Sequence, residues 1–206
     1  MDFTPFVLHH LPAPPARVLE VGCGEEGGVT PSLLEAGYDV LAIDPDAPEG
    51  PHYRQIALEE LEEPQRFDAV VAGRVLHHVE PLAPALDKLV RLAPLLVLDE
   101  FASERLHGPT AEWYEAQFRV LAAAGRDPRA PSDLRSWRAH HQDELHPSGV
   151  LLRELAARYD ERHVEWRPYL YRWLGGPATE GLEQSLIDAG AIEAVGFRYV
   201  GVARPV

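Results

Sequence analysis

The chain has 206 residues, of which 46% are hydrophobic and 25% are charged, a composition typical of a globular domain. This length is sufficient for one α/β domain and too short for two full ones. Acidic residues outnumber Lys and Arg by 33 to 19, and the formal net charge is −14. Because nucleic-acid binders depend on Lys and Arg contacts with phosphates, this charge disfavours a nucleic-acid partner.

The chain has no apolar stretch of about 18 residues, and no basic segment leads into an apolar one near Met1. A membrane span would require the long apolar stretch, and a secretory signal would require the basic segment followed by an apolar one. We therefore expect no membrane association and a cytoplasmic location.

Apolar runs and amphipathic segments alternate along the first half of the chain. In order, we expect a helix at 4–10, a strand at 16–21, a helix at 30–37, strands at 39–43, 53–56 and 68–72, a helix at 81–92 and a strand at 94–99. Strands that alternate with helices predict a parallel sheet with right-handed crossovers. Pro45, Pro48 and Pro51 disfavour a regular helix between the second and third strands.

The second half departs from this alternation. A polar and aromatic segment, residues 100–147, follows the fifth predicted strand and is interrupted between Gly125 and Pro131. Beyond it we expect a helix at 150–155, a bent or edge strand at 163–174 that contains Pro168, a helix at 179–189 and a final strand at 196–203.

A glycine-rich turn connects the first predicted strand to the following helix. Residues 20–28 read E-V-G-C-G-E-E-G-G, and Thr30-Pro31 opens the helix. A Cβ at Gly22 or Gly24 would block the close approach of a ligand to the backbone N–H groups of such a turn. The turn is therefore a candidate cofactor cradle. The single cysteine, Cys23, lies in it and is expected to fill space, since no neighbouring His or Arg would activate its thiol.

An acidic residue ends the second predicted strand. Asp44 lies 44 − 24 = 20 residues after Gly24, the separation at which a carboxylate meets ribose hydroxyls in dinucleotide-binding folds. Both a dinucleotide and S-adenosylmethionine carry an adenosine ribose, so this pair leaves the cofactor open. Glu20 favours S-adenosylmethionine, because a carboxylate beside the turn would repel a pyrophosphate and attract a cation.

Three segments together resemble the class I S-adenosylmethionine-dependent methyltransferases: V-L-E-V-G-C-G at 18–24, I-D-P-D at 43–46 and F-D-A-V-V-A-G-R-V-L-H-H-V at 67–79. The resemblance extends from about residue 16 to the C-terminus. It implies a single domain over 1–206 with a Rossmann-like, doubly wound α/β sheet, mostly parallel with an antiparallel last strand. Residues 100–147 would then be a helical lid inserted after the fifth strand, where ligands bind in open α/β sheets.

The sequence departs from the family pattern at two places. The family usually has G-x-G-x-G, whereas Gly22, Gly24 and Gly27 spell G-x-G-x-x-G, a pattern shared with nicotinamide and flavin enzymes. We interpret this as a turn that is one residue longer. Ala57 stands where many relatives carry an Asp for the adenine amino group, so we expect adenine to contact the backbone near Ala57 and Leu58.

The resemblance implies a set of cofactor-binding residues at the carboxyl ends of the strands. They are Glu20, Gly22, Cys23, Gly24, Asp44, Pro45, Ala57, Leu58, Ala72, Gly73 and Arg74. Within this set, Arg74 is expected to bind the methionine carboxylate through charge-assisted hydrogen bonds.

A sulfonium is already activated, so the protein mainly has to align the acceptor and exclude water. His77 and Tyr114 are the candidate catalytic residues, and we expect the adjacent His78 to be a buried histidine that satisfies backbone groups. The His140–His146 segment contains imidazole and carboxylate side chains, which are ligands of zinc and iron. It lacks the H-E-x-x-H pattern, and we predict no metal site.

These features predict methyl transfer from S-adenosylmethionine to a small-molecule acceptor, with S-adenosylhomocysteine as the product. A nicotinamide-dependent oxidoreductase is the alternative that the G-x-G-x-x-G spelling suggests. A binding or regulatory protein that keeps the fold without catalysis is a further alternative, because no residue is an unambiguous base.

Overall fold

The computed structural model describes residues 3–125, 131–141 and 145–205. They form two compact units. The sheet unit contains the chain up to Glu100, Gly149–Val164 and the residues from Arg198 onward. The helical unit contains Phe101–Ser148 and Glu165–Phe197. None of the helices within these described residues has the length and apolar character that a membrane crossing requires.

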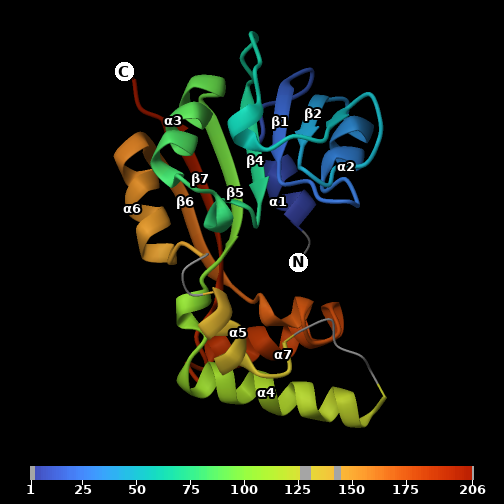
Figure 1. Cartoon of the computed structure of the whole chain (residues 1–206), viewed down its shortest axis with the longest axis vertical. Helices are drawn as coiled ribbons and strands as arrows, with labels where there is room; N and C mark the ends of the chain where they lie inside the picture. Colours follow the sequence, from blue (N-terminus) through green and yellow to red (C-terminus); the bar gives the residue numbers. More distant parts are fainter. Residues whose placement is uncertain (1–2, 126–130, 142–144, 206) are drawn as a thin grey trace. The chain divides into compact units, whose positions relative to one another are not determined.

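A seven-stranded sheet with the order β3-β2-β1-β4-β5-β7-β6 organises the fold (Figure 1). Its strands are β1 (Arg17–Val21), β2 (Asp39–Ile43), β3 (Tyr53–Arg54), β4 (Ala69–Gly73), β5 (Leu95–Phe101), β6 (Tyr159–Arg167) and β7 (Gly196–Ala203). The pairs β1–β2, β1–β4, β2–β3 and β4–β5 are parallel, and the last strands are antiparallel. The predicted Rossmann-like α/β fold is confirmed.

Buried aliphatic runs explain the strands at the centre of the sheet. β1 and β4 are almost wholly buried, as expected for parallel strands covered on both faces. Alternate residues such as Val18, Val40 and Val71 share one face, where they join a hydrophobic core with Val7 and Leu33. These last two residues come from helices α1 (Phe3–His10) and α2 (Thr30–Glu35), which therefore cover that face.

Helix α3 (Leu82–Leu92) crosses between β4 and β5, and its buried residues include Leu86 and Leu89 on one stripe. It lies in front of β5 in Figure 1. The connection between β2 and β3 contains no helix among the described residues, as Pro45, Pro48 and Pro51 predicted. Two short 3-10 helices follow the next strands: η1 (Leu58–Glu60) comes after β3, and η2 (Leu76–His78) comes after β4.

The strand expected at 163–174 is displaced. Helix α6 (Ser148–Arg158) leads directly into β6, which ends at Arg167, before Pro168. Proline cannot donate to the ladder, so pairing stops there. The next residues form η4 (Leu170–Arg172), because the buried carboxylate of Glu183 accepts hydrogen bonds from the N–H groups of residues 169, 170 and 171 at 2.8, 3.0 and 2.7 Å.

The helical unit has a hydrophobic core of its own. The unit comprises helices α4 (Gly108–Ala123), α5 (Leu134–His141) and α7 (Pro177–Asp188), together with η3 (Ser103–Arg105) and η4. Buried Phe101, Tyr114 and Leu134 pack with Tyr169 and Leu174 in this core. The segment that the sequence predicts as a lid therefore shares its core with residues 165–197.

Candidate functional site

The carboxyl ends of three parallel strands meet at one point of the sheet unit. In the register of the sheet, Val21 is the partner of Ile43 on one side and of Ala72 on the other. The chain after β1 therefore lies between the chain segments that follow β2 and β4. The strand order reverses between β1 and β4, which is the switch point where ligands bind in open α/β sheets.

The glycine turn after β1 requires glycine for different reasons at different positions. Gly22 has φ = 81°, and a Cβ there would lie 2.6 Å from the Cβ of Val75. Gly24 has φ = 61°, but a Cβ there would meet no atom within 4 Å. Gly22 is thus a packing requirement of the protein itself, whereas the backbone at Gly24 borders open space that a ligand can enter.

Glu20 faces the protein backbone. Its Oε1 accepts the Val29 N–H at 2.8 Å, and its Oε2 accepts the N–H and the hydroxyl of Thr30 at 2.8 and 2.6 Å. Burial raises the pKa of this carboxyl, which is only 3% exposed. A Cβ at Gly28 would overlap the Glu20 carboxylate, so this glycine leaves room for it. In this geometry Glu20 fixes the turn and the start of α2 and does not line the space beside Gly24.

Asp44 connects the ends of β1 and β2. Its Oδ2 accepts the Gly24 N–H at 3.0 Å, and its Oδ1 accepts the Asp46 N–H at 2.9 Å. The residue is only partly buried. Each carboxylate oxygen can accept a second hydrogen bond, so Asp44 retains capacity for hydroxyl donors of a ligand.

A cavity of about 320 Å³ opens beside Asp44. Gly22, Asp44, Pro45, Ala57 and Leu58 line it together with Val75, His78 and Glu80. The Ala57 N–H donates to Glu60 at 3.2 Å, whereas the Leu58 N–H opens η1, where helical N–H groups have no partner within the helix. The cavity, the open backbone at Gly24 and the carboxylate of Asp44 together fit an adenosine-bearing cofactor.

Arg74, Asp99 and Arg198 form a charged cluster where β4 ends. Arg74 has φ = 58°, which is uncommon for a residue other than glycine, and its N–H donates to the Asp99 carbonyl at 2.6 Å. Asp99 is 3% exposed and lies 3.2 Å from Arg198 Nε and 3.8 Å from Arg74 Nη1. The Arg74 side chain is 40% exposed, so it can reach a ligand while it remains near Asp99.

The histidine pair after β4 is arranged in the opposite way to the prediction. His77 is buried, and its Nδ1 lies 2.5 Å from Glu100 Oε2, whereas His78 is exposed and lines the cavity. The prediction that His78 is the buried residue is therefore wrong. The reason is Glu100 on β5, whose Oε1 also accepts the N–H groups of Val75 and Leu76 and so fixes this turn.

Two further predicted site residues are enclosed. Burial raises the pKa of the Cys23 thiol to about 12, and the thiol packs with Ala42 and Ala47, as expected for a residue that fills space. Tyr114 is fully buried in the core of the helical unit and donates its hydroxyl to the Pro131 carbonyl at 2.9 Å. Burial also raises the pKa of Tyr114, which opposes a role as a base.

The His140–His146 segment falls partly outside the described residues, since 142–144 are not among them. Among the residues that are described, no group of three or more His, Cys, Asp or Glu side chains is placed to hold a metal ion. The His141 Nδ1–H donates to the Trp137 carbonyl at 2.8 Å.

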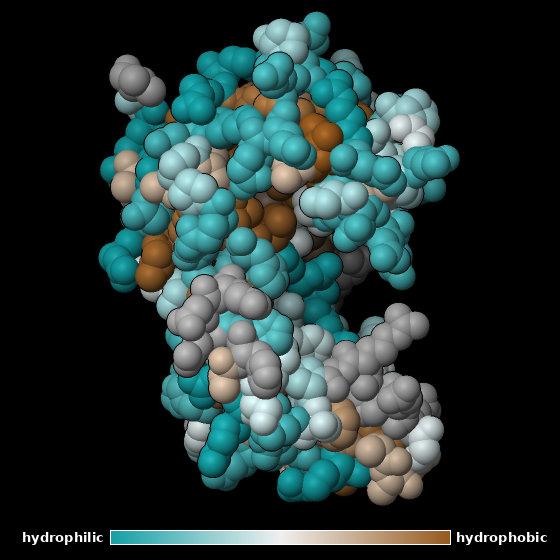
Figure 2. Space-filling view, viewed as in Figure 1, coloured by the Kyte–Doolittle hydropathy of each residue, from teal (hydrophilic) through white to brown (hydrophobic). Residues whose placement is uncertain are grey.

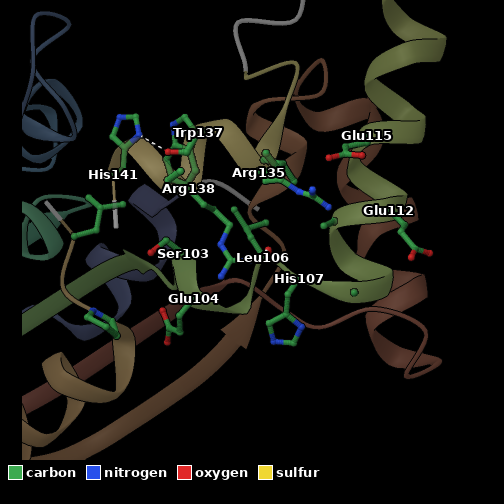
Figure 3. Close-up of a pocket in the computed structure, with 16 residues that line it drawn as sticks. Ser103, Glu104, Leu106, His107, Glu112, Glu115, Arg135, Trp137, Arg138 and His141 are labelled. Atoms are coloured by element: carbon green, nitrogen blue, oxygen red, sulfur yellow. Dashed lines mark hydrogen bonds between the residues drawn. The ribbon is translucent and has the colours of Figure 1, made fainter. Parts of the chain in front are cut away.

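A second and larger cavity, of about 570 Å³, lies within the helical unit (Figure 3). η3, the first turns of α4 and most of α5 line it. Leu106, Leu134 and Trp137 form its apolar wall, and charged residues of both signs surround the remainder. The residues that line this cavity belong to the segment 100–147, which the sequence predicts to be a lid. The sequence does not predict a cavity within that segment.

The sequence did not predict three residues at or near the site: Val75 lines the first cavity, Glu100 fixes the turn after β4, and Arg198 pairs with Asp99. The available signal was the pair Asp99-Glu100, two carboxylates within an otherwise apolar strand. Buried carboxylates require partners, and here these are the turn after β4 and Arg198.

The methyltransferase domain family matches residues 2–162, which is most of the chain. The protein belongs to this family, the class I S-adenosylmethionine-dependent methyltransferases. No curated protein shows significant sequence similarity to the chain. The family uses S-adenosylmethionine as its cofactor.

Solved methyltransferase structures share the fold. An S-adenosylmethionine-dependent methyltransferase from Mesorhizobium loti is 18% identical with a TM-score of 0.59, and the alignment covers 97% of this chain and 96% of that one. Magnesium protoporphyrin IX methyltransferase from Synechocystis PCC 6803, with bound S-adenosylhomocysteine, is 16% identical with a TM-score of 0.56 over 98% and 80% of the two chains. N-methyltransferase NodS from Bradyrhizobium japonicum WM9 is 13% identical with a TM-score of 0.54 over 92% and 79%.

Proposed function

We propose that the protein binds S-adenosylmethionine in the cavity at the ends of β1, β2 and β4 and transfers its methyl group to a small-molecule acceptor. The observation that carries the proposal is the hydrogen bond from the Gly24 N–H to Asp44, which places a carboxylate at the mouth of a cavity beside an open backbone. Family membership supports the reaction class.

Each end of the cofactor has candidate partners. Asp44 would accept both ribose hydroxyls, and the Leu58 N–H would donate to adenine, since the Ala57 N–H already donates to Glu60. Gly22, Gly24, Ala72 and Gly73 would provide the backbone surface for the methionine end, and Arg74 its cation. Glu20 and Cys23 are also predicted from the sequence to bind the cofactor, and they would contribute by fixing the conformation of the glycine turn.

When bound, S-adenosylmethionine supplies a methyl group on a cationic sulfur that needs no further activation. The residues of this chain then have to hold the acceptor and, where the acceptor carries a proton, remove it. His78 lines the cavity and is the histidine that could do so. His77, engaged by Glu100, would be a positioning residue for the turn at 75–78.

We further propose that residues 100–147 act as a lid that becomes ordered when cofactor and acceptor bind, as active-site lids commonly do. Hydrogen exchange would show rising protection in α4 and α5 on ligand addition. Core-like protection that is equal with and without ligands would refute the lid. Deletion of the segment would be a poor test, because Phe101, Tyr114 and Leu134 share a core with Tyr169 and Leu174.

Calorimetry with S-adenosylmethionine, S-adenosylhomocysteine and NAD tests the function directly. Binding of the first two and not of NAD is expected, because Asp44, Glu59 and Glu80 line the cavity and would repel a pyrophosphate. An acceptor screen that detects S-adenosylhomocysteine release then tests catalysis. Preference for NAD would establish the oxidoreductase alternative, and cofactor binding without turnover of any acceptor would favour the regulatory one.

A further inference from the structure

The cavity of the helical unit has two walls of opposite charge. Helix α5 contributes Arg135 and Arg138, and helix α4 contributes Glu112 and Glu115. Each pair is spaced three residues apart, so its members lie on the same face of their helix, one turn from each other. Figure 3 shows the arginines extending from α5, with Arg135 directed toward α4.

Burial distinguishes an inner pair from an outer pair. Arg138 and Glu115 are half-buried, whereas Arg135 and Glu112 are exposed at the rim. The Arg138 Nη1 donates to the Leu106 carbonyl at 2.8 Å, which orients the guanidinium and leaves other N–H donors of the group available. Within the described part of the chain, Glu115 forms no ion pair within 4 Å.

The floor between the two walls is apolar. Trp137 of α5 lines the cavity with buried Leu106 and Leu134, and its ring also packs against Phe101 and Trp173, with centroids 5.9 and 5.4 Å away. His141 stacks on Trp137 with ring centroids 4.7 Å apart and closes one side of the indole. A volume of about 570 Å³ is within the range of sites for small organic ligands.

The protein as a whole is acidic. The chain carries 19 basic residues against 33 acidic ones, and the face shown in Figure 2 is mostly hydrophilic. The lining of the cavity carries both signs, with Arg135 and Arg138 against Glu104, Glu112 and Glu115. A purely cationic ligand would be repelled by Arg138, and a purely anionic one by Glu115.

From these walls we infer that the cavity binds a small zwitterion with an apolar, planar body, in other words an amino-acid-like molecule. Arg138 binds its carboxylate, Glu115 binds its ammonium group, and Trp137 contacts its body. The identification of this molecule as the methyl acceptor rests on the proposed function, whereas its binding does not.

Calorimetry with three indole compounds separates the two charges. Tryptophan carries both groups, tryptamine only the amine and indole-3-propionate only the carboxylate. We expect tryptophan to bind at least about 10-fold more tightly than either of the others, since a hydrogen-bonded charge contributes about 1.5–3 kcal/mol. Equal affinities for the three compounds, or no binding of tryptophan at about 10 mM, would overturn the inference.

Two variants test which residue binds each charged group of the ligand. Arg138→Met should weaken tryptophan and indole-3-propionate about 10-fold and should not weaken tryptamine. Glu115→Gln should weaken tryptophan and tryptamine and should not weaken indole-3-propionate. Arg162→Met and Glu161→Gln change the same charges at exposed positions outside the cavity and should have no effect. If Arg138→Met does not fold, the compound series on the unmodified protein and on Glu115→Gln still decides the question.

A parallel titration with S-adenosylmethionine distinguishes the two proposals. Tryptophan selectivity without S-adenosylmethionine binding would overturn the proposed function and keep the zwitterion site. Normal S-adenosylmethionine binding without tryptophan selectivity would overturn only the zwitterion site.

Discussion

Replacement of Asp44 by Ala should weaken S-adenosylmethionine binding about 10- to 150-fold. Its two carboxylate oxygens already accept the N–H groups of Gly24 and Asp46, at 3.0 and 2.9 Å, and would each accept one ribose hydroxyl. Loss of one hydrogen bond to a charged group costs about 1.5–3 kcal/mol, and a factor of ten corresponds to about 1.4 kcal/mol. The range counts the net loss as one such bond and not two, because water replaces part of the lost contact.

Isothermal titration calorimetry on the Asp44→Ala variant measures this change, and Asp46→Ala provides the matched control. Asp46 is an exposed neighbour whose hydrogen bond to Asp44 uses only its backbone N–H, which alanine retains. The control should bind within twofold of the parent. Thermal unfolding of both variants separates a loss of the Gly24 contact from a loss of ribose contacts. An Asp44→Ala protein that binds within twofold of the parent would refute the assignment.

Gly24→Ala should remain folded and bind S-adenosylmethionine at least tenfold more weakly, because the added Cβ would enter open space beside the backbone. Gly22→Ala should lower the free energy of unfolding more than Gly24→Ala does, because its Cβ would meet Val75, and equal unfolding free energies of the two variants would contradict this difference. Gly28→Ala should cost more in urea unfolding than Gly125→Ala, which has a similar positive φ but no neighbour within 4 Å of an added Cβ. Cys23 should resist iodoacetamide at pH 8 in the native protein, since a pKa of about 12 leaves a thiolate fraction of about 10⁻⁴. The thiol should react once the protein is unfolded, and rapid labelling of the native protein would contradict the burial of Cys23.

The sequence allowed prediction of the elements that depend on local pattern. The turn at Gly22–Gly28 and the position of Asp44 follow from an apolar run, a glycine cluster and a fixed separation, and the structure brings Gly24 and Asp44 into contact. The start of β6 could not be predicted, because α6 passes into it at Arg158-Tyr159 without a turn residue.

Features that depend on a distant side chain were also beyond sequence reasoning. The choice between His77 and His78 as the buried histidine is made by Glu100, 23 residues away from His77, and nothing within the L-H-H-V run distinguishes them. Likewise, Tyr114 could be placed on a helix, but its enclosure in a core with Tyr169 depends on how residues 165–197 fold against α4.

The contact between Glu20 and Gly28 restricts how this sequence can change during evolution. Because a Cβ at position 28 would occupy the space of the Glu20 carboxylate, the two positions cannot vary independently. A substitution at position 28 becomes tolerable only after position 20 has acquired a smaller side chain, and that change removes the acceptor for Val29 and Thr30. Homologues that retain the longer turn should therefore preserve both residues or replace both, which is a pairwise covariation that a family alignment would reveal.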